Sequence, residues 1–223
     1  MSECMTAAKA YGVFAPMSSG LSQEWVKALE HQVFPQIDTL LLNDAYFKLF
    51  TEARRLTGKF NGYIAQMIEA GYVTSQTVAI RRLCDGRRDV ISLRRVLMEF
   101  NSDNTKTRNE VSRLLSKLVD CDHVCEMVNN FVAHTANPDH QKHGVGEWNL
   151  RIGHLTDAQR AICEVAIKFD RDILRRRNRV KVMPVPSGRV MEEFEPWVPA
   201  DDIQKLWNFW HAHDASVNAW MPA

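Results

Sequence analysis

The helix around which this sequence is organised is carried by residues 121–138, which read CDHVCEMVNNFVAHTANP. Apolar side chains recur at helical spacing along the stretch, and Pro138 ends the run. A second face carries Glu126, Asn130 and His134 at successive i, i+4 positions. This face is polar but almost uncharged, so it is suited to polar contact. The apolar positions are Val124, Val128, Phe131 and Val132.

The segments on both sides also have helical spacing. Ser22 is placed to cap the first helix, and Pro35 marks either a break or the first turn of the next one, so residues 22–57 form two helices or one kinked helix. Ser92 is predicted to cap another, and Thr156 opens a capping box before the last long helix of the bundle. Strand-like alternation appears only briefly in the tail. The pattern predicts an all-α, mostly antiparallel helical bundle.

The two ends of the chain differ from its middle. We expect a loose N-terminus over residues 1–20, the helical bundle over 21–178, and a C-terminal tail over 179–223. The tail has prolines at 184, 186, 196 and 199, which predict extended segments at 180–186 and 196–199 because proline disfavours helix at the preceding residue. Asp201 or Asp202 can then cap a short Trp-rich helix, which we interpret as a packing or dimerisation element.

Composition excludes several classes of protein. The chain has 223 residues, of which 45% are hydrophobic and 25% charged, as in ordinary globular domains. No apolar run reaches the roughly 18 residues of a membrane span, so no membrane partner is expected. An odd number of cysteines, five, and no signal peptide in front of them indicate a cytoplasmic protein.

Gly-rich phosphate loops, nucleophile elbows and paired catalytic carboxylates are not found, and no cofactor is predicted.

Basic residues gather in two places although the net charge is only +1. The first is the run from Arg81 to Arg95, and the second is the run from Arg171 to Lys181. Such patches attract phosphate-rich partners, so Arg81, Arg175, Arg176 and Arg177 are candidate RNA contacts. The alternative is that they are a solvated helix end and, for Arg81, an i, i+4 ion pair with Asp85.

Two blocks of this sequence resemble a known superfamily. Asn129-Asn130-Phe131-Val132-Ala133-His134 is similar to the signature helix of HEPN proteins, and residues 79–85 with 91–97 resemble the Ile-Arg-Arg-Leu-x-Asp and Ser-Leu blocks of the AbiU-like abortive-infection branch. Active HEPN ribonucleases have an Arg where this chain has Asn129.

The resemblance implies a toxin or antiphage-defence protein that cuts RNA as a homodimer, with both signature helices in one composite cleft. His134 would be the acid/base, Asn130 an orienting group, and Arg82 the source of the charge that Asn129 does not supply. The implied partners are RNA, a second copy, and an antitoxin or other defence-system protein.

Three alternatives remain open at this point. His134 can instead be a helix-terminal residue bonded to backbone or to Glu126. The chain can be a HEPN domain without catalysis that binds RNA, a nucleotide or a partner protein, which the Asn at position 129 favours. It can also be a helical interaction module whose tail recruits another chain.

A metal site is the last candidate. Cys121, His123 and Cys125, with His140 and His143, contain zinc ligands, but the Cys-x-x-x-Cys spacing without a second pair matches no common structural site. We therefore predict no metal and expect Cys121 and Cys125 on the buried face.

Overall fold

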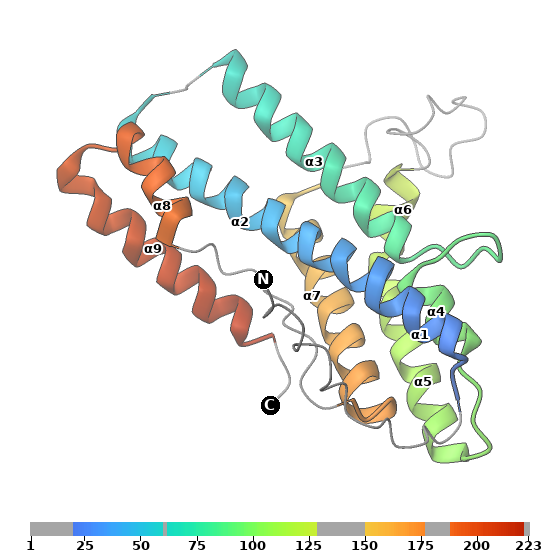
Figure 1. The fold of residues 1–223 in the computed structure, drawn as a ribbon. Helices are drawn as coiled ribbons and strands as arrows, with labels where there is room; N and C mark the ends of the chain where they lie inside the picture. The colour runs from blue at the N-terminus through green and yellow to red at the C-terminus, as the bar shows by residue number, and fades with distance from the viewer. Residues whose placement is uncertain (1–19, 60–61, 129–149, 177–187, 221–223) are drawn as a thin grey trace, which may run out of the picture.

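The structure of the protein is a computed structural model that describes residues 20–59, 62–128, 150–176 and 188–220. Within these ranges every regular element is a helix and there is no strand, so the predicted all-α class is confirmed (Figure 1). The elements are α1 (Gln23–Ala28), a π turn (Leu29–Val33), α2 (Phe34–Thr57), α3 (Tyr63–Leu83), α4 (Leu93–Glu99), α5 (Thr105–Lys117), a 3-10 turn (Leu118–Cys121), α6 (Asp122–Met127), α7 (Ile152–Lys168), a second π turn (Phe169–Ile173), α8 (Gly188–Phe194), a 3-10 turn (Glu195–Trp197) and α9 (Ala200–Asn218).

The first long helix runs through the expected break. Ser22 caps α1 by accepting a hydrogen bond from the Trp25 backbone N–H, as predicted. The π turn then leads directly into α2, where Pro35 lies in the first turn and, because it has no N–H, leaves one intrahelical hydrogen bond unmade. Gly58 ends α2 in the left-handed conformation, with a φ of 63°. Of the two alternatives for residues 22–57, one long helix with a π turn is the observed one.

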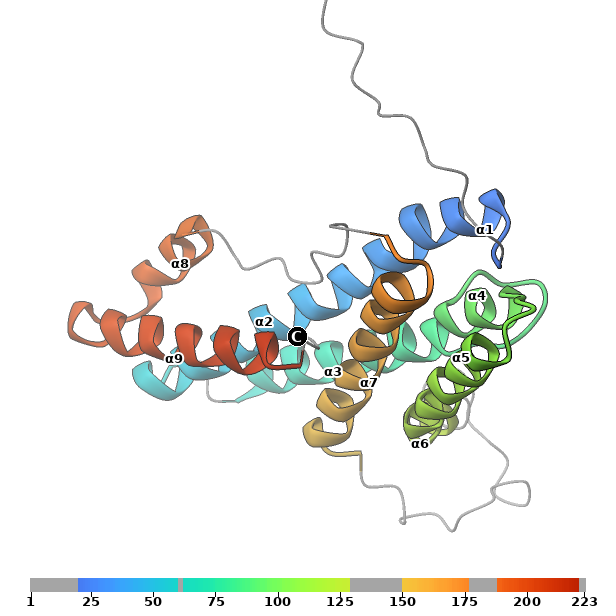
Figure 2. The same cartoon turned by 90° about the horizontal axis from the view of Figure 1, so that it is seen from below.

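The main core is built around α7, which lies between the α2–α3 pair and α5 (Figure 2). Its apolar face is removed from solvent, with Leu155, Ile162 and Val165 each at 0% exposure. A fully buried Leu, Ile or Phe stabilises the fold by about 1.5–3 kcal/mol, so this face accounts for the central position of α7. From α4 and α5 the same core takes Leu93, Val96, Leu97, Val111 and Leu114.

A polar network lies inside the bundle beside this core. The Tyr72 hydroxyl donates to Asp44 Oδ1 at 2.5 Å, and Lys48 Nζ lies 2.7 Å from Asp44 Oδ2. Gln159 Nε2 donates to Gln76 Oε1 at 3.1 Å, which joins α7 to α3. Buried polar groups are stable only when they are hydrogen-bonded, so these contacts fix the register of α2, α3 and α7.

The C-terminal helix packs on its own chain. Leu206 and Trp210 of α9 form a second, smaller core with Leu49 and Ala53 of α2, and Trp210 is only 2% exposed. Figure 2 shows α8 and α9 on one side of α2, away from α4–α6. Trp197, in contrast, is 51% exposed. The interpretation of the Trp-rich helix as a packing element is confirmed for Trp210.

Three local predictions were wrong. Thr156 does not cap α7, because the helix already begins at Ile152 and the Thr156 hydroxyl donates to the Ile152 carbonyl inside it. Residues 196–199 are not wholly extended, because Pro196 lies in the first turn of a 3-10 helix, where a missing N–H costs nothing. The last helix is neither short nor capped by Asp201 or Asp202, since α9 has 19 residues, begins at Ala200 and has Pro199 at its N-cap.

Among the described helices, none is both long enough and apolar enough to cross a membrane.

Candidate functional site: an arginine cleft at the end of α3

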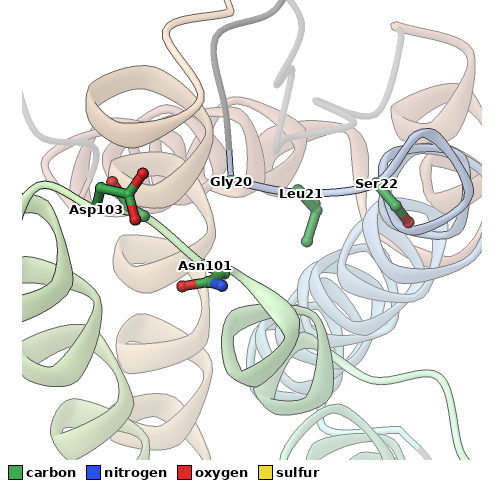
Figure 3. A pocket seen from close by; sticks show the side chains of 6 residues that line it. Gly20, Leu21, Ser22, Asn101 and Asp103 are labelled. Carbon is green, nitrogen blue, oxygen red and sulfur yellow. The ribbon is translucent and has the colours of Figure 1, made fainter.

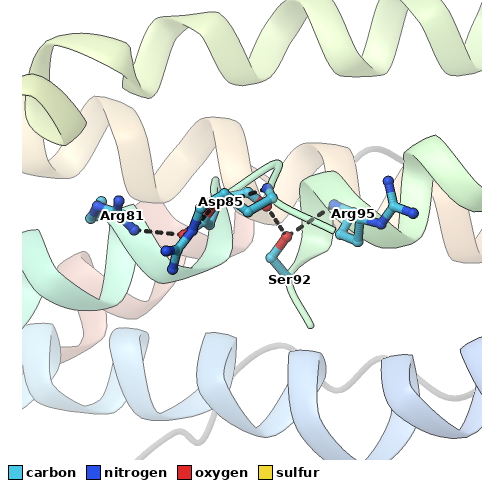
Figure 4. A network of polar contacts seen from close by, with 5 residues as sticks. Arg81, Asp85, Ser92 and Arg95 are labelled. Carbon is cyan, nitrogen blue, oxygen red and sulfur yellow. Dashed lines mark hydrogen bonds and ion pairs between the residues drawn. The ribbon is translucent and has the colours of Figure 1, made fainter. Parts of the chain in front are cut away.

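The turn after α3 is fixed by side-chain hydrogen bonds. Ser92 caps α4 by accepting from the Arg95 backbone N–H at 2.9 Å, as predicted, and its hydroxyl donates to the Asp85 carbonyl (Figure 4). Ser92 is 0% exposed, so this contact is shielded from water. The loop from Cys84 to Ile91 is therefore held against the start of α4.

Asp85 is the centre of the charged contacts in this turn. Arg81 Nη1 lies 2.7 Å from Asp85 Oδ2, which confirms the predicted i, i+4 contact, and Arg87 Nε lies 3.1 Å from the same oxygen. Burial alone would raise the pKa of Asp85, but the Arg87 backbone N–H and the Arg81 guanidinium lower it below its usual value. Asp85 is therefore ionised over the physiological range and orders two arginines.

Arg82 differs from its neighbours. Its side chain is exposed and makes no ion pair or side-chain hydrogen bond within the described part of the chain. It borders a surface cleft of about 360 Å³ that also contains Arg81, Arg87 and Asp85. Three arginines against two aspartates give the cleft a formal charge of +1. The cleft is lined by Gln32, Gln36, Arg81, Arg82, Asp85, Arg87, Asp89, Val90 and Ile91.

The opposite wall of the cleft comes from the first long helix. Gln32 lies in the π turn and Gln36 in the first turns of α2, so their amides face the same space as the arginines. Amide N–H₂ groups donate hydrogen bonds without adding charge. Guanidinium groups together with amides are the donors that bind phosphate oxygens of a nucleic-acid backbone. π turns within α-helices frequently occur at functional sites.

The second basic cluster is arranged differently. Arg176 has only 11% of its side chain exposed and lies 2.6 Å from both Asp170 and Glu30. Its guanidinium also lies over the Phe34 ring, 5.9 Å from the centroid. Through these contacts Arg176 joins the π turn that follows α7 to the first long helix. Arg175 is exposed, and the predicted contact Arg177 lies outside the described residues.

Much of the predicted catalytic set cannot be placed. Asn129, Asn130 and His134 lie outside the described residues, which reach Val128 just after α6. The first part of the predicted signature segment is described: it contains α6, which packs against α3, and Arg94 Nη2 lies 3.4 Å from Asp122 Oδ1. The stretch that leads to His134 therefore begins beside the helix that carries Arg82.

A second hollow, of about 390 Å³, lies where the chain enters α1 (Figure 3). It is lined by Gly20, Leu21, Ser22, Asn101, Ser102 and Asp103. The Asn101 backbone N–H donates to the Gly20 carbonyl at 2.7 Å and ties the two segments together. Its lining contains an acidic side chain and no basic one, so it does not suit a phosphate.

Some residues of the arginine cleft were not predicted from the sequence. Arg87 belongs to the basic run from Arg81 to Arg95, so it could have been selected. Gln32 and Gln36 carry no signal of their own, because two glutamines four residues apart are ordinary on an exposed helix face.

No group of three or more His, Cys, Asp or Glu side chains is arranged to hold a metal ion among the residues that the structure describes. His140 and His143 lie outside those residues.

Comparisons with protein-family models, with curated proteins and with solved structures gave no match. The HEPN assignment made from residues 79–97 and 129–134 therefore stays a prediction.

Proposed function

We propose that this protein is a HEPN-like endoribonuclease of a bacterial phage-defence or toxin system that cuts RNA without a metal ion. The observation that carries the proposal is the arginine cleft, in which Arg82 is exposed and unpaired within the described residues while Arg81 and Arg87 are ordered by Asp85. An unpaired arginine between two ordered ones offers a phosphate a cation that no carboxylate already neutralises.

The proposed reaction uses three groups. His134 would take the proton from the ribose 2′-OH or return one to the leaving 5′-oxygen, because imidazole titrates near pH 6.5. Asn130 would orient the imidazole. Arg82 would stabilise the negative charge that develops on the phosphoryl oxygens, a part that Asn129 cannot play because an amide offers only a dipole.

The position of Arg82 is compatible with this part. The C-terminal turn of α3 carries Arg82, and α6, which leads toward residues 129–134, packs on α3. In the proposed homodimer the arginine acts on the His134 of its own chain or on that of the second copy.

The second candidate is a HEPN domain that binds RNA or a nucleotide in the same cleft without cutting it. Asn129 favours this candidate, because the position normally taken by the catalytic Arg lacks a charge.

The deciding experiment is RNA cleavage by the purified protein in excess chelator, on total RNA and a tRNA pool. We compare wild type, His134→Ala, Arg82→Gln and Arg88→Gln. Arg88 is the matched control, since it is exposed in the same basic run but does not line the cleft. The proposal expects cleavage by wild type and Arg88→Gln and loss of cleavage in the other two. Cleavage that survives His134→Ala would refute the assigned acid/base.

Binding separates the two candidates. The affinity for labelled single-stranded RNA is measured at several salt concentrations. Arg82→Gln is expected to reduce the magnitude of the slope of log K against log salt by about 0.7, the value for one lost phosphate contact. Arg88→Gln should keep the wild-type slope. Binding with this pattern but without cleavage supports the inactive HEPN domain. Equal slopes in all three proteins would reject the cleft as an RNA site.

A further inference from the structure

The first half of α3 exposes a row of large apolar side chains. The exposed fractions are 76% for Tyr63, 59% for Ile64, 57% for Met67 and 38% for Ile68. These residues lie in the first two turns of the helix, at the edge of the molecule in Figure 1. Among the described elements other than α3, none contributes more than one large apolar side chain with this degree of exposure. Single exposed apolar residues are ordinary, whereas a contiguous row marks a contact surface.

The exposed face continues along α3 with the spacing of a helix–helix seam. Its positions follow each other at alternating intervals of three and four residues, as in the a and d positions of a coiled coil, and all of them are exposed. At 1.5 Å per residue this face is about 21 Å long. We call it the α3 seam, and it consists of Ile64, Met67, Gly71, Thr74 and Val78.

Gly71 lies at the centre of the α3 seam, and the fold of a single chain gives no reason for a glycine there. A Cβ added at Gly71 would meet no atom within 4 Å. Glycine inside an exposed helix is also less favourable than alanine. A residue without a side chain is useful at this point when the backbone of a second helix approaches closely.

The α3 seam is complementary in size to a second copy of itself. The half before Gly71 carries the large side chains of Met67 and Ile68, whereas the half after it carries the small side chains of Thr74 and Ser75. In an antiparallel pair with its two-fold axis at Gly71, the large side chains of each copy lie on the small side chains of the other. A partner helix that is large along its whole length would not fit in this way.

The charges also favour a second copy. Glu69 is the one charged residue in the sequence from Tyr63 to Ile80, and at two positions from Gly71 it points away from the seam. Two seams can therefore meet without bringing like charges together. The Ser75 hydroxyl donates to the Tyr72 carbonyl within α3 at 2.9 Å, so a partner can cover it without leaving a donor unsatisfied.

We propose that the α3 seam is a self-association face, on which α3 of a second copy packs antiparallel with the two-fold axis at Gly71. One pair of short helices is at the small end of protein–protein interfaces, so the dimer is weak and reversible. Arg82 follows Val78 by four residues on the same face, so the second copy lies beside the arginine cleft. The proposal does not depend on ribonuclease activity, because it uses neither His134 nor RNA.

Sedimentation velocity of the full chain across the micromolar range tests the association. We compare wild type with Met67→Glu, which places a charge in the seam, and with Met98→Glu, the matched control, because Met98 is 50% exposed in α4. Wild type and Met98→Glu are expected to dimerise with rising concentration, and Met67→Glu to stay monomeric with an unchanged circular dichroism spectrum. A wild type that stays monomeric throughout, or a Met67→Glu that associates like wild type, would overturn the proposal.

Gly71→Leu tests the close approach of the two backbones. Its side chain meets open space in the monomer, so the fold should be kept. In the dimer it pushes the helices apart, and we expect association to weaken about tenfold, the effect of overpacking a tight contact. Unchanged association of Gly71→Leu would contradict a two-fold axis at this residue.

Disulfide cross-linking tests the antiparallel arrangement. Gly71→Cys lies on the proposed axis and should link to itself under mild oxidation, as identified by mass spectrometry of an unreduced digest with oxidised wild type as the control. The two Ile64 positions are about 21 Å apart in the antiparallel pair, because each is seven residues from the axis. Ile64→Cys should therefore not link to itself but should link to Val78→Cys when the two proteins are mixed. Self-linking of Ile64→Cys at the rate of Gly71→Cys would mean a parallel pair and overturn the proposal.

Discussion

Tyr72→Phe tests whether the buried network between α2 and α3 stabilises the bundle. The Tyr72 hydroxyl donates to Asp44 Oδ1 at 2.5 Å, and the two side chains are almost completely buried. The Tyr72 ring stacks on Phe47 with centroids 3.7 Å apart. Phenylalanine keeps this ring and its burial, so the substitution removes only the hydroxyl and the hydrogen bond that it donates.

The expected loss of stability depends on the contacts that Asp44 retains in the variant. A hydrogen bond to a charged group contributes about 1.5–3 kcal/mol, and the carboxylate that loses it stays buried. Lys48 still pairs with the other oxygen at 2.7 Å, which limits the penalty. We therefore expect a loss of about 2 kcal/mol in the free energy of unfolding. For a chain of this size that lowers Tm by about 4–8 °C.

Urea denaturation followed by circular dichroism measures this loss. Tyr46→Phe is the matched control, since Tyr46 lies in α2 but is only half-buried, and it should change stability by less than about 0.5 kcal/mol. Equal midpoints for the two variants would refute the reasoning. Burial raises the pKa of Tyr72 far above its usual value, so wild type should lose stability as pH rises above about 10, where the unfolded tyrosine ionises, and Tyr72→Phe should lose less.

Three further predictions concern stability and use the same denaturation assay. Arg176→Gln should cost about 3 kcal/mol because it removes the ion pair between Arg176 and the buried Asp170 carboxylate. Arg175→Gln should stay within about 0.5 kcal/mol, because Arg175 is exposed; equal costs would contradict the assigned ion pair. Trp210→Ala should cost about 3–5 kcal/mol and exposed Trp197→Ala almost nothing, and a neutral Trp210→Ala would mean that α9 is not packed on α2. Hydrogen bonds from Lys117 and then Lys168 lower the pKa of Glu164. The stabilisation of the fold by ionised Glu164 is therefore present above about pH 4.3 and is lost as pH falls through the lowered pKa. The free energy of unfolding of Glu164→Gln should decrease less on acidification than that of wild type.

Local signals in the sequence were enough for most of the bundle. Ser22 and Ser92 cap the helices that they were expected to cap, because capping depends on neighbours within one turn. The prediction for Thr156 was wrong although its local pattern is equally good, because this pattern lies inside α7. The helix begins earlier, where His154 Nδ1 accepts a hydrogen bond from the Arg151 backbone N–H at 3.3 Å. Tertiary packing decided the length of α9, because its apolar residues are buried against Leu49 and Ala53.

The candidate site was less predictable than the fold. The contact between Arg81 and Asp85 follows from i, i+4 spacing. The cleft itself needs the π turn of the first long helix opposite the loop after α3, and no pattern within either segment specifies that approach.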